Sequence, residues 1–319
     1  MYLRLLYTII ALMLAVHAIA QDGFPAKPIR VIVGYTPGGV TDIAARTLSA
    51  GMSEGLGRSV VVENRGGAAG AVGAEHVRRA APDGYTMLLS PNGPMTIMPA
   101  ISTKVPYSPT RDFVGVSMVG SFPLILVVNS SKPIKSVKEL VDYGKARPDD
   151  ANYAGSGTMI QLASELFNLR SGSRFVHIPF KGSGDSITAL LSGHVTMAVM
   201  DAAPATGPLK SGKLRGLAVT SASRLPAWPE FPTMAEAGLS DMVITPWVGF
   251  FLPVGTPQPI VRRLQEEVAR VVNIPDVRAR LESLGITPAG TSSEEFARTV
   301  AADLERYSAI AKAANISVD

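Results

Sequence analysis

Short apolar runs alternate along the chain with longer stretches in which apolar residues recur at helical spacing. We predict strands at Ile29–Val33, Val60–Glu63, Thr86–Leu89, Leu124–Val128, Phe175–Ile178, Thr196–Val199, Leu217–Val219 and Val248–Leu252. Several of these runs are nearly all apolar, as expected of parallel strands that are covered on both faces. The repeated alternation of strand and helix therefore predicts an α/β fold with mainly parallel sheets.

Predicted helix starts include three capping boxes, in which Ser or Thr is followed three positions later by Glu or Gln. They are Ser136-Val137-Lys138-Glu139, Thr158-Met159-Ile160-Gln161 and Ser292-Ser293-Glu294-Glu295. A helix from Pro259 places Ile260, Leu264, Val268 and Val271 on one stripe, which predicts a core-facing surface. About the last 55 residues are expected to be entirely helical.

Two proline-rich stretches indicate where the chain passes between domains. One runs from Pro91 to Pro123 and the other from Pro226 to Pro257. If both are crossings, residues 21–123 and 246–319 form a discontinuous first domain, and residues 124–245 form an inserted second domain. Two crossing strands make a natural hinge, and a cleft between domains is a favoured ligand site.

Composition and charge exclude several classes of protein. The 319 residues are 46% hydrophobic, which excludes a disordered chain. The formal charge is +4 and the 30 basic residues are dispersed, so we expect no nucleic-acid partner. The absence of cysteine excludes disulfides, thiolate metal sites, thiol nucleophiles and a lipid-anchored N-terminal cysteine.

The first 20 residues have the pattern of a secretory signal peptide. Arg4 precedes an apolar stretch from Leu5 to Val16, and Ala18-Ile19-Ala20 matches the A-x-A cleavage pattern. Twelve apolar residues are too few to span a bilayer, which needs about 20. The alternative is a buried N-terminal helix. We expect cleavage before Gln21, export to the periplasm and a soluble mature protein without a lipid anchor.

The loop after the first strand has the composition of an anion site. It comprises Tyr35, Thr36, Pro37, Gly38, Gly39, Val40, Thr41 and Asp42, and a helix follows it. Glycines allow backbone N–H groups to approach a ligand, and a helix N-terminus presents unpaired N–H donors at the positive end of its dipole. Such a loop suits a carboxylate or a phosphate. The alternative is a tight turn in which Thr41 or Asp42 simply caps the helix.

Similar loops follow other predicted strands, and together they outline one crevice at the carboxyl ends of the strands. The additional candidate ligand-binding residues are Ser90, Asn92, Gly155, Ser156, Gly157, Thr158, Lys181, Gly182 and Asp201. Lys181 is equally consistent with a solvated loop lysine, and Asp201 with a helix cap. Tyr35 could cover a ligand or pack in the core, whereas Trp228 and Trp247 are expected to pack near the hinge.

Motifs for catalysis, metals and nucleotides are missing. The Gly66–Gly73 stretch lacks the G-x-G-x-x-G register and is interpreted as a turn with close helix packing. His76, His177 and His194 have no compact ligand spacing, and no Ser stands in G-x-S-x-G. We therefore expect a protein that is not an enzyme and that needs no metal or cofactor.

The loops described above belong to a longer ordered set of motifs that resembles the tripartite tricarboxylate transporter substrate-binding proteins, also called the Bug family. The matching segments are Pro28–Val33, Pro37–Asp42, Val62–Arg65, Ala81–Thr86, Pro179–Gly182, Gly212–Arg215, Pro232–Gly238 and Pro253–Pro257. They cover essentially the whole mature chain. The set is specific to the family and not to one ligand.

The resemblance implies a periplasmic-binding-protein-like, or Venus flytrap, architecture with a cleft that closes on a small carboxylate. Carboxylates in this family are held largely by main-chain amides and waters from the loops that match Thr36–Asp42 and the Gly155–Gln161 region. The receptor would deliver its ligand to the permease subunits of a membrane transporter. A sensor kinase is the alternative partner, and a secreted hydrolase is the alternative from another class. A monomer is the default expectation.

Two departures from the family pattern concern the second loop. The loop of Gly155, Ser156, Gly157 and Thr158 is about two residues shorter than is usual in the family, and Gln161 stands where a His is common. Met159 and Ile160 make this edge more apolar. An aromatic or branched carboxylate therefore fits the pattern as well as an acidic amino acid does.

Overall fold

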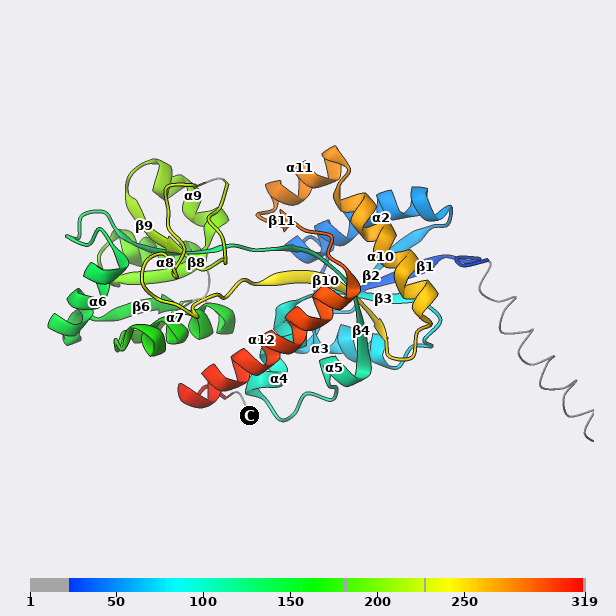
Figure 1. Ribbon diagram of the computed structural model, residues 1–319, viewed down its shortest axis with the longest axis horizontal. Coiled ribbons are helices and arrows are strands. Elements are labelled where there is room, and N and C mark those ends of the chain that lie inside the picture. Colours follow the sequence, from blue (N-terminus) through cyan, green and yellow to red (C-terminus); the bar gives the residue numbers. More distant parts are fainter. Residues whose placement is uncertain (1–22, 156, 181–182, 227, 318–319) are drawn as a thin grey trace, which may run out of the picture.

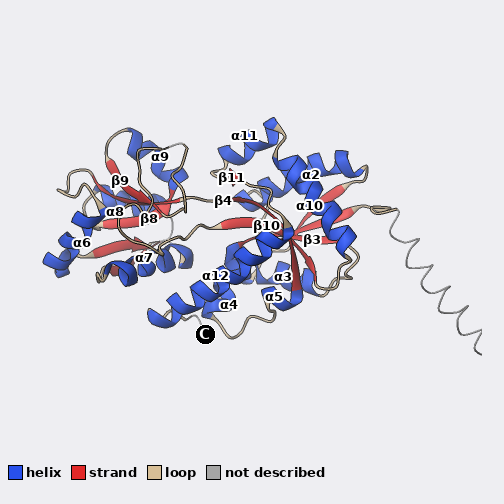
Figure 2. Ribbon diagram, viewed as in Figure 1, coloured by secondary structure: helices blue, strands red, loops and turns tan. Residues whose placement is uncertain are grey.

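A computed structural model describes residues 23–155, 157–180, 183–226 and 228–317. The chain forms two β-sheets, and helices cover both faces of each (Figures 1 and 2). We call the first sheet with its helices lobe A and the second sheet with its helices lobe B. This arrangement confirms the predicted α/β class.

Lobe A is built on a six-stranded sheet in the order β11-β4-β10-β3-β1-β2. Its strands are β1 (Ile29–Val33), β2 (Val60–Asn64), β3 (Thr86–Pro91), β4 (Phe113–Ser121), β10 (Trp247–Pro253) and β11 (Thr287–Pro288). Its helical segments are α2 (Val40–Leu56), η1 (Ala68–Gly70), α3 (Ala71–Arg78), η2 (Gly93–Ile97), α4 (Met98–Ile101), α5 (Pro109–Asp112), α10 (Gln258–Val272), α11 (Pro275–Ser283) and α12 (Ser293–Ala313). One core packs α2 and α10 on the sheet, and the other packs α3 and α12 on the opposite face.

Lobe B is built on a five-stranded sheet in the order β7-β6-β8-β5-β9. Its strands are β5 (Leu124–Asn129), β6 (Asn152–Gly155), β7 (Val176–Pro179), β8 (Met197–Asp201) and β9 (Leu214–Val219). Its helical segments are α6 (Val137–Ala146), η3 (Pro148–Asp150), α7 (Thr158–Ser171), α8 (Ser183–Leu191) and α9 (Ala202–Lys210). Residues of α6 and α7 pack on one face of the sheet, and residues of α8 and α9 pack on the other.

Three segments connect the lobes. The chain leaves lobe A between β4 and β5 and returns just before β10, and the two crossings touch where Phe122 N–H donates to Pro246 O at 2.7 Å. The third segment is α12, which starts beside β4 and extends to α4 and α7 (Figure 1). Its residues Tyr307 and Ile310 join Ile97 and Ile101 in the same apolar cluster as the lobe B core. The end of α12 therefore packs against both lobes.

Among the described residues, no helix is long and apolar enough to cross a bilayer.

The expectation of mainly parallel sheets is wrong, because both sheets are mixed. Strands β1, β2 and β3 run parallel, but β10 runs antiparallel to both β3 and β4, and β5 runs antiparallel to both β8 and β9. The crossings explain this result, since the strand that enters a lobe from the interface, β10 in lobe A and β5 in lobe B, runs against the strands that end there.

Three local predictions also need correction. The sequence did not predict β4, which lies inside the proline-rich stretch interpreted as the first crossing. The C-terminal region is not entirely helical, since β11 pairs with β4. Ser136 and Ser292 cap their helices as predicted, but α7 has Gly157 at its N-cap and Thr158 inside its first turn.

Candidate functional site

The β1–α2 loop ends at a helix N-terminus that no side chain caps. The N-cap residue is Gly39, with φ −76° and ψ 166°, so neither Thr41 nor Asp42 caps the helix as the alternative interpretation supposed. Positive φ occurs instead at Gly38, at 87°. Among the described residues, no hydrogen bond is formed by the N–H groups of Val40 and Thr41. These groups remain available to an anion.

Asp42 stabilises this loop from within. Its carboxylate is 3% exposed and accepts from Gly38 N–H at 2.9 Å, from Arg46 at 3.0 and 3.1 Å, and from Asn64 Nδ2 at 2.9 Å. Burial alone would raise the pKa of Asp42, but the donors from Arg46, Gly38 and Asn64 outweigh it and hold the pKa below its ordinary value. The side chain therefore fixes the loop and has little capacity left for a ligand.

A hollow of about 410 Å³ lies beside this loop at the carboxyl ends of β1 and β2. Its lining includes Tyr35, Thr36 and Pro37, which the sequence nominated, together with Asn64 and residues from Gly66 to Gly70. The other nominated residues do not line this hollow. Asn64 was missed as a site residue, although its side chain donates to Tyr35 O at 3.1 Å and so joins β2 to the β1–α2 loop. Its place at the carboxyl end of a strand was the available signal.

The far wall of the hollow is a strained turn. Ala68 and Ala69 have φ values of 45° and 51°, a left-handed conformation that costs about 1–2 kcal/mol per non-glycine residue. Tyr35 Oη donates to Ala69 O at 3.1 Å. Burial raises the pKa of Tyr35 to about 12, so its hydroxyl remains a donor at neutral pH. Gly73 packs against Gly34, which agrees with the predicted turn and close helix packing.

The β3–η2 loop carries the nominated Ser90 and Asn92. Ser90 is buried and donates to Pro91 O at 2.9 Å, so its hydroxyl serves the backbone. Asn92 Nδ2 lies 3.3 Å from Sδ of Met159 in the first turn of α7. Since Asn92 belongs to lobe A and Met159 to lobe B, this contact brings the two predicted loops together across the lobe interface.

The β6–α7 loop repeats the features of the first loop. Gly157 is the N-cap, has φ 89°, and provides no side-chain cap. Among the described residues, Thr158 and Met159 N–H groups have no partner. Gly155 is buried and ends β6. The nominated Ser156, Lys181 and Gly182 lie outside the described residues.

Asp201 lies at the end of β8 and at the N-cap position of α9, but its side chain forms no capping hydrogen bond. The side chain therefore does not cap α9 as the alternative interpretation supposed, and its role in binding stays a prediction. Burial raises the pKa of Asp201. The next helix residues also face lobe A, because a Cβ on Gly285 would lie 2.9 Å from Cβ of Ala203. The lobes thus approach each other at Ala203 as well as at Met159.

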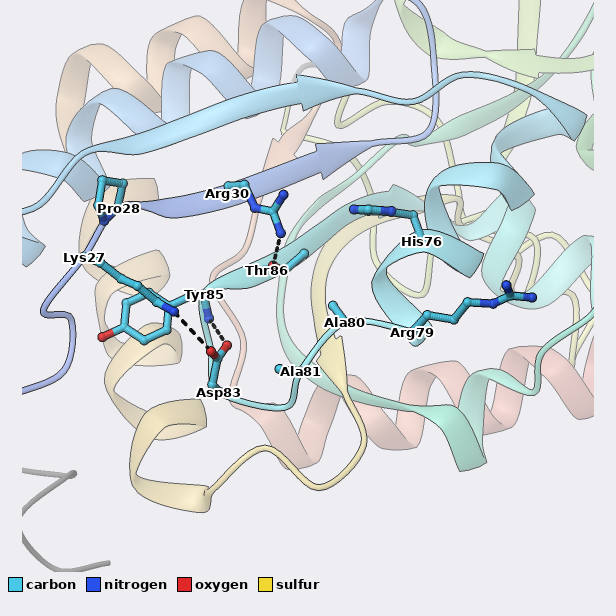
Figure 3. A pocket seen from close by; sticks show the side chains of 10 residues that line it. All are labelled: Lys27, Pro28, Arg30, His76, Arg79, Ala80, Ala81, Asp83, Tyr85 and Thr86. Carbon is cyan, nitrogen blue, oxygen red and sulfur yellow. Dashed lines mark hydrogen bonds and ion pairs between the residues drawn. The ribbon is translucent and has the colours of Figure 1, made fainter. Parts of the chain in front are cut away.

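A second hollow, of about 440 Å³, lies at the opposite end of β1 and β3 (Figure 3). Its lysine and arginine side chains already have partners: Lys27 pairs with Asp83, Arg30 donates to Thr86, and Arg79 pairs with Glu75. His76 also lines it, and burial together with nearby arginines lowers the pKa of this imidazole. Because these cations are engaged and the hollow is remote from the strand carboxyl ends, we do not assign the ligand site here.

Among the described residues, no group of three or more His, Cys, Asp or Glu is placed to hold a metal ion.

Comparisons with known proteins cover most of the chain. A model described as tripartite tricarboxylate transporter family receptor matches residues 44–316. Protein BugT of Bordetella pertussis is 35% identical over 297 residues, which are 92% of this chain and 91% of BugT. An R. palustris protein solved with adipate is 32% identical with a TM-score of 0.73, covering 92% of this chain and 99% of that one. MatC from Rhodopseudomonas palustris, with bound malate, is 32% identical with a TM-score of 0.69, covering 90% and 99%.

Proposed function

The chain belongs to the tripartite tricarboxylate transporter receptor family and is a solute-binding receptor, and from this premise we propose that it binds a small organic carboxylate between its lobes. The adipate and malate held by the two R. palustris relatives support this ligand class. The chemistry available in the site supports it as well.

The observation that carries the proposal is the uncapped N-terminus of α2. The N–H groups of Val40 and Thr41 have no partner among the described residues, and the loop that precedes them lines the hollow at Thr36 and Pro37. A carboxylate there would accept from these donors and be favoured by the helix dipole. The N-terminus of α7 offers a second set of donors, suited to another carboxylate or polar group. Backbone donors need no metal.

We propose that the two lobes are domains of residues 21–123 with 246–319 and residues 124–245. They would close on the ligand by rotation at the paired crossings, where Phe122 and Pro246 are joined. The contacts at Met159 and Ala203 support the view that closure brings both loops to one ligand.

We further propose export to the periplasm through removal of residues 1–20, which lie outside the described residues, and delivery of the ligand to the permease subunits of a membrane transporter. In that role the ligand is bound and released unchanged. Recovery of a chemically altered product from purified protein would contradict this part of the proposal.

A thermal-shift screen against a library of carboxylic acids tests ligand binding. A ligand present at 100 times its dissociation constant should stabilise the protein by about 2.7 kcal/mol. Titration calorimetry with a chelator present should then give the same affinity as without it. If no carboxylate stabilises the protein, or if the chelator abolishes binding, the proposed function or its metal-free mechanism is wrong.

A further inference from the structure

The glycine-rich segment after β2 contains one glycine that the backbone does not require. Gly70 and Gly73 pack too closely for a side chain, since an added Cβ would lie 2.6 and 2.7 Å from atoms of other segments. Gly67 has φ 139°, a conformation that favours glycine. Gly66 has neither constraint, because its φ lies outside the left-handed region and the atoms nearest to an added Cβ are 3.5 Å away. Alanine would therefore fit the backbone at position 66.

The space in front of Gly66 is part of the hollow beside the β1–α2 loop. Gly66 and Thr36 both line this hollow, and a Cβ on Gly66 would lie 3.5 Å from Thr36 N and 3.5 Å from the carbonyl carbon of Tyr35. The N–H of Thr36 forms no hydrogen bond with any described residue. Since Thr36 lies ahead of the N-cap residue Gly39, this donor is separate from those of the helix N-terminus. The absent side chain thus leaves the peptide group before Thr36 open to the hollow.

Most side-chain donors of this hollow are already used within the protein. Nδ2 of Asn64 donates one hydrogen to Tyr35 O at 3.1 Å and the other to Asp42 Oδ1 at 2.9 Å. The hydroxyl of Tyr35 donates to Ala69 O at 3.1 Å. None of the described residues that line the hollow carries a charge. The donors left for a carboxylate are therefore backbone N–H groups and the Thr36 hydroxyl.

Resting on the proposed carboxylate-binding function, we propose that Gly66 is a positioning residue that keeps the Thr36 N–H open as a donor to the carboxylate of the ligand. A carboxylate has two oxygens, so it can accept from Thr36 as well as from the first turn of α2. Because backbone donors have fixed positions, the free space at position 66 decides whether the carboxylate reaches Thr36. A methyl group there would hold the ligand away from this donor.

Gly66→Ala tests the inference, with the acid that the thermal-shift screen identifies and with adipate and malate as the first probes. The affinity measured by titration calorimetry should fall about 10-fold, the value of one hydrogen bond to a charged group. The melting temperature without ligand should stay the same or rise slightly, because alanine fits the backbone and lowers the entropy of the unfolded chain.

The amide proton of Thr36 reports on the proposed contact directly. In the wild type, its NMR signal should move downfield when the acid saturates the protein, because a carboxylate is a strong, charged acceptor. In Gly66→Ala, the same signal should move less at saturation. A glycine that served only the fold would leave this ligand-induced shift unchanged when it is replaced.

Gly23→Ala is the matched control. Gly23 is exposed ahead of β1, at the opposite end of that strand from the hollow, has no left-handed φ, and has no atom within 4 Å of an added Cβ. It should keep the wild-type affinity, and an equal loss in both variants would overturn the inference.

Three other results would overturn it while the proposed function stands. They are full affinity in Gly66→Ala, a Gly66→Ala protein less stable than the wild type, and a Thr36 amide signal that does not move when the wild type is saturated. Failure of the wild type to bind any carboxylate removes the proposed function and this inference together.

Discussion

The imidazole of His177 lies directly over Gly155, so that a Cβ on Gly155 would be 2.2 Å from Nε2 of His177. The ring also stacks on Tyr153, with centroids 5.1 Å apart and an angle of 21° between the planes. Nε2 of His177 is buried and has no partner among the described residues. Packing against Tyr153 and Gly155 therefore helps to hold this ring at the base of the β6–α7 loop.

Gly155→Ala should destabilise the protein because the new methyl group displaces the His177 ring. Overpacking of a well-packed position costs roughly 1–3 kcal/mol. His177→Ala should remove the obstacle, so that Gly155→Ala costs much less in that background. Urea unfolding of the two single variants and the double variant measures the coupling. Additive costs would show that the contact does not restrict residue 155.

The adjacent glycines of the first loop should respond differently to alanine. Gly38 has φ 87°, so Gly38→Ala should cost about 1–2 kcal/mol of backbone strain. Gly39 has φ −76°, and the atom nearest to a Cβ added there is Thr36 O, at 3.9 Å. Gly39→Ala should therefore change stability by less than about 1 kcal/mol, because the lower entropy of the unfolded chain is offset by the poorer N-cap that alanine makes.

Chemical denaturation of both variants checks this contrast. Val at position 39 would abolish binding if Gly39 had positive φ or touched the ligand. The first condition is not met. Loss of carboxylate affinity in a stable Gly39→Ala protein would therefore indicate close approach of the ligand, and equal destabilisation of both variants would contradict the backbone argument.

The strained turn beside the hollow offers a stabilising substitution. Ala69→Gly removes the left-handed penalty at φ 51°, and the extra entropy of glycine in the unfolded chain offsets part of the gain. We expect a net stabilisation of about 0.5–1 kcal/mol. Ala71→Gly is the control. Because Ala71 has φ −63°, this substitution relieves no strain and should lower the free energy of unfolding by a similar amount. A destabilising Ala69→Gly would mean that the alanine methyl groups contribute packing that outweighs the strain.

The sequence predicted the strands whose apolar residues face two cores. It did not predict a strand whose pairing depends on a distant part of the chain. Val31 packs in one core and Ile32 in the other, so β1 was recognisable as a fully covered strand. The strand β4 was hidden because its flanking prolines indicate loop, while its pairing with β10 depends on chain return more than 120 residues later.

The candidate site divides in the same way. The glycine-rich segments at the strand ends predicted the loops, because the backbone geometry of such loops depends on the local residue types. The partners of the side chains were not predictable. Asp42 is satisfied by Asn64 from the next strand, and Asn92 by Tyr307 from the last helix. Such contacts join residues far apart in the chain. They depend on tertiary packing, which cannot be predicted from local residue patterns.

Closure of the lobes should be sensitive to the small residues that meet at Ala203 and Gly285. Ala203 is exposed, but a Cβ on Gly285 would lie 2.9 Å from its methyl group, so a larger side chain at position 203 would press against the 285 region. Ala203→Leu should leave stability unchanged and weaken ligand binding roughly 5- to 100-fold by opposing closure. Small-angle scattering should show compaction with ligand in the wild type and less in the variant. Lys210→Leu, at the other end of α9, is the control, and equal affinities would contradict closure at this contact.

Acid should destabilise lobe A through Asp42, whose pKa is lowered in the folded protein. Burial opposes this shift, but the hydrogen bonds from Arg46, Gly38 and Asn64 exceed it. The unfolded chain then binds a proton at a higher pH than the folded chain does. Stability from Asp42 is therefore complete above the ordinary pKa of 3.8 and is lost as the pH falls through the folded value. The slope for one proton is at most about 1.4 kcal/mol per pH unit.

Urea unfolding of wild type and Asp42→Asn, from about pH 6 to about pH 3, measures this contribution as the difference between the two profiles. The asparagine variant should be less stable at the upper end, because Gly38 N–H and Arg46 lose a charged acceptor, and the two curves should converge in acid. Asp142→Asn, at an exposed helical ion pair with Lys138, should give a nearly flat difference. The affinity for the ligand should fall with the ionised fraction of Asp42. Protonation of Asp42 releases Gly38 N–H and loosens the first turn of α2, which is proposed to hold the carboxylate. Parallel profiles for wild type and Asp42→Asn would show that the four hydrogen bonds to Asp42 do not stabilise its charged form.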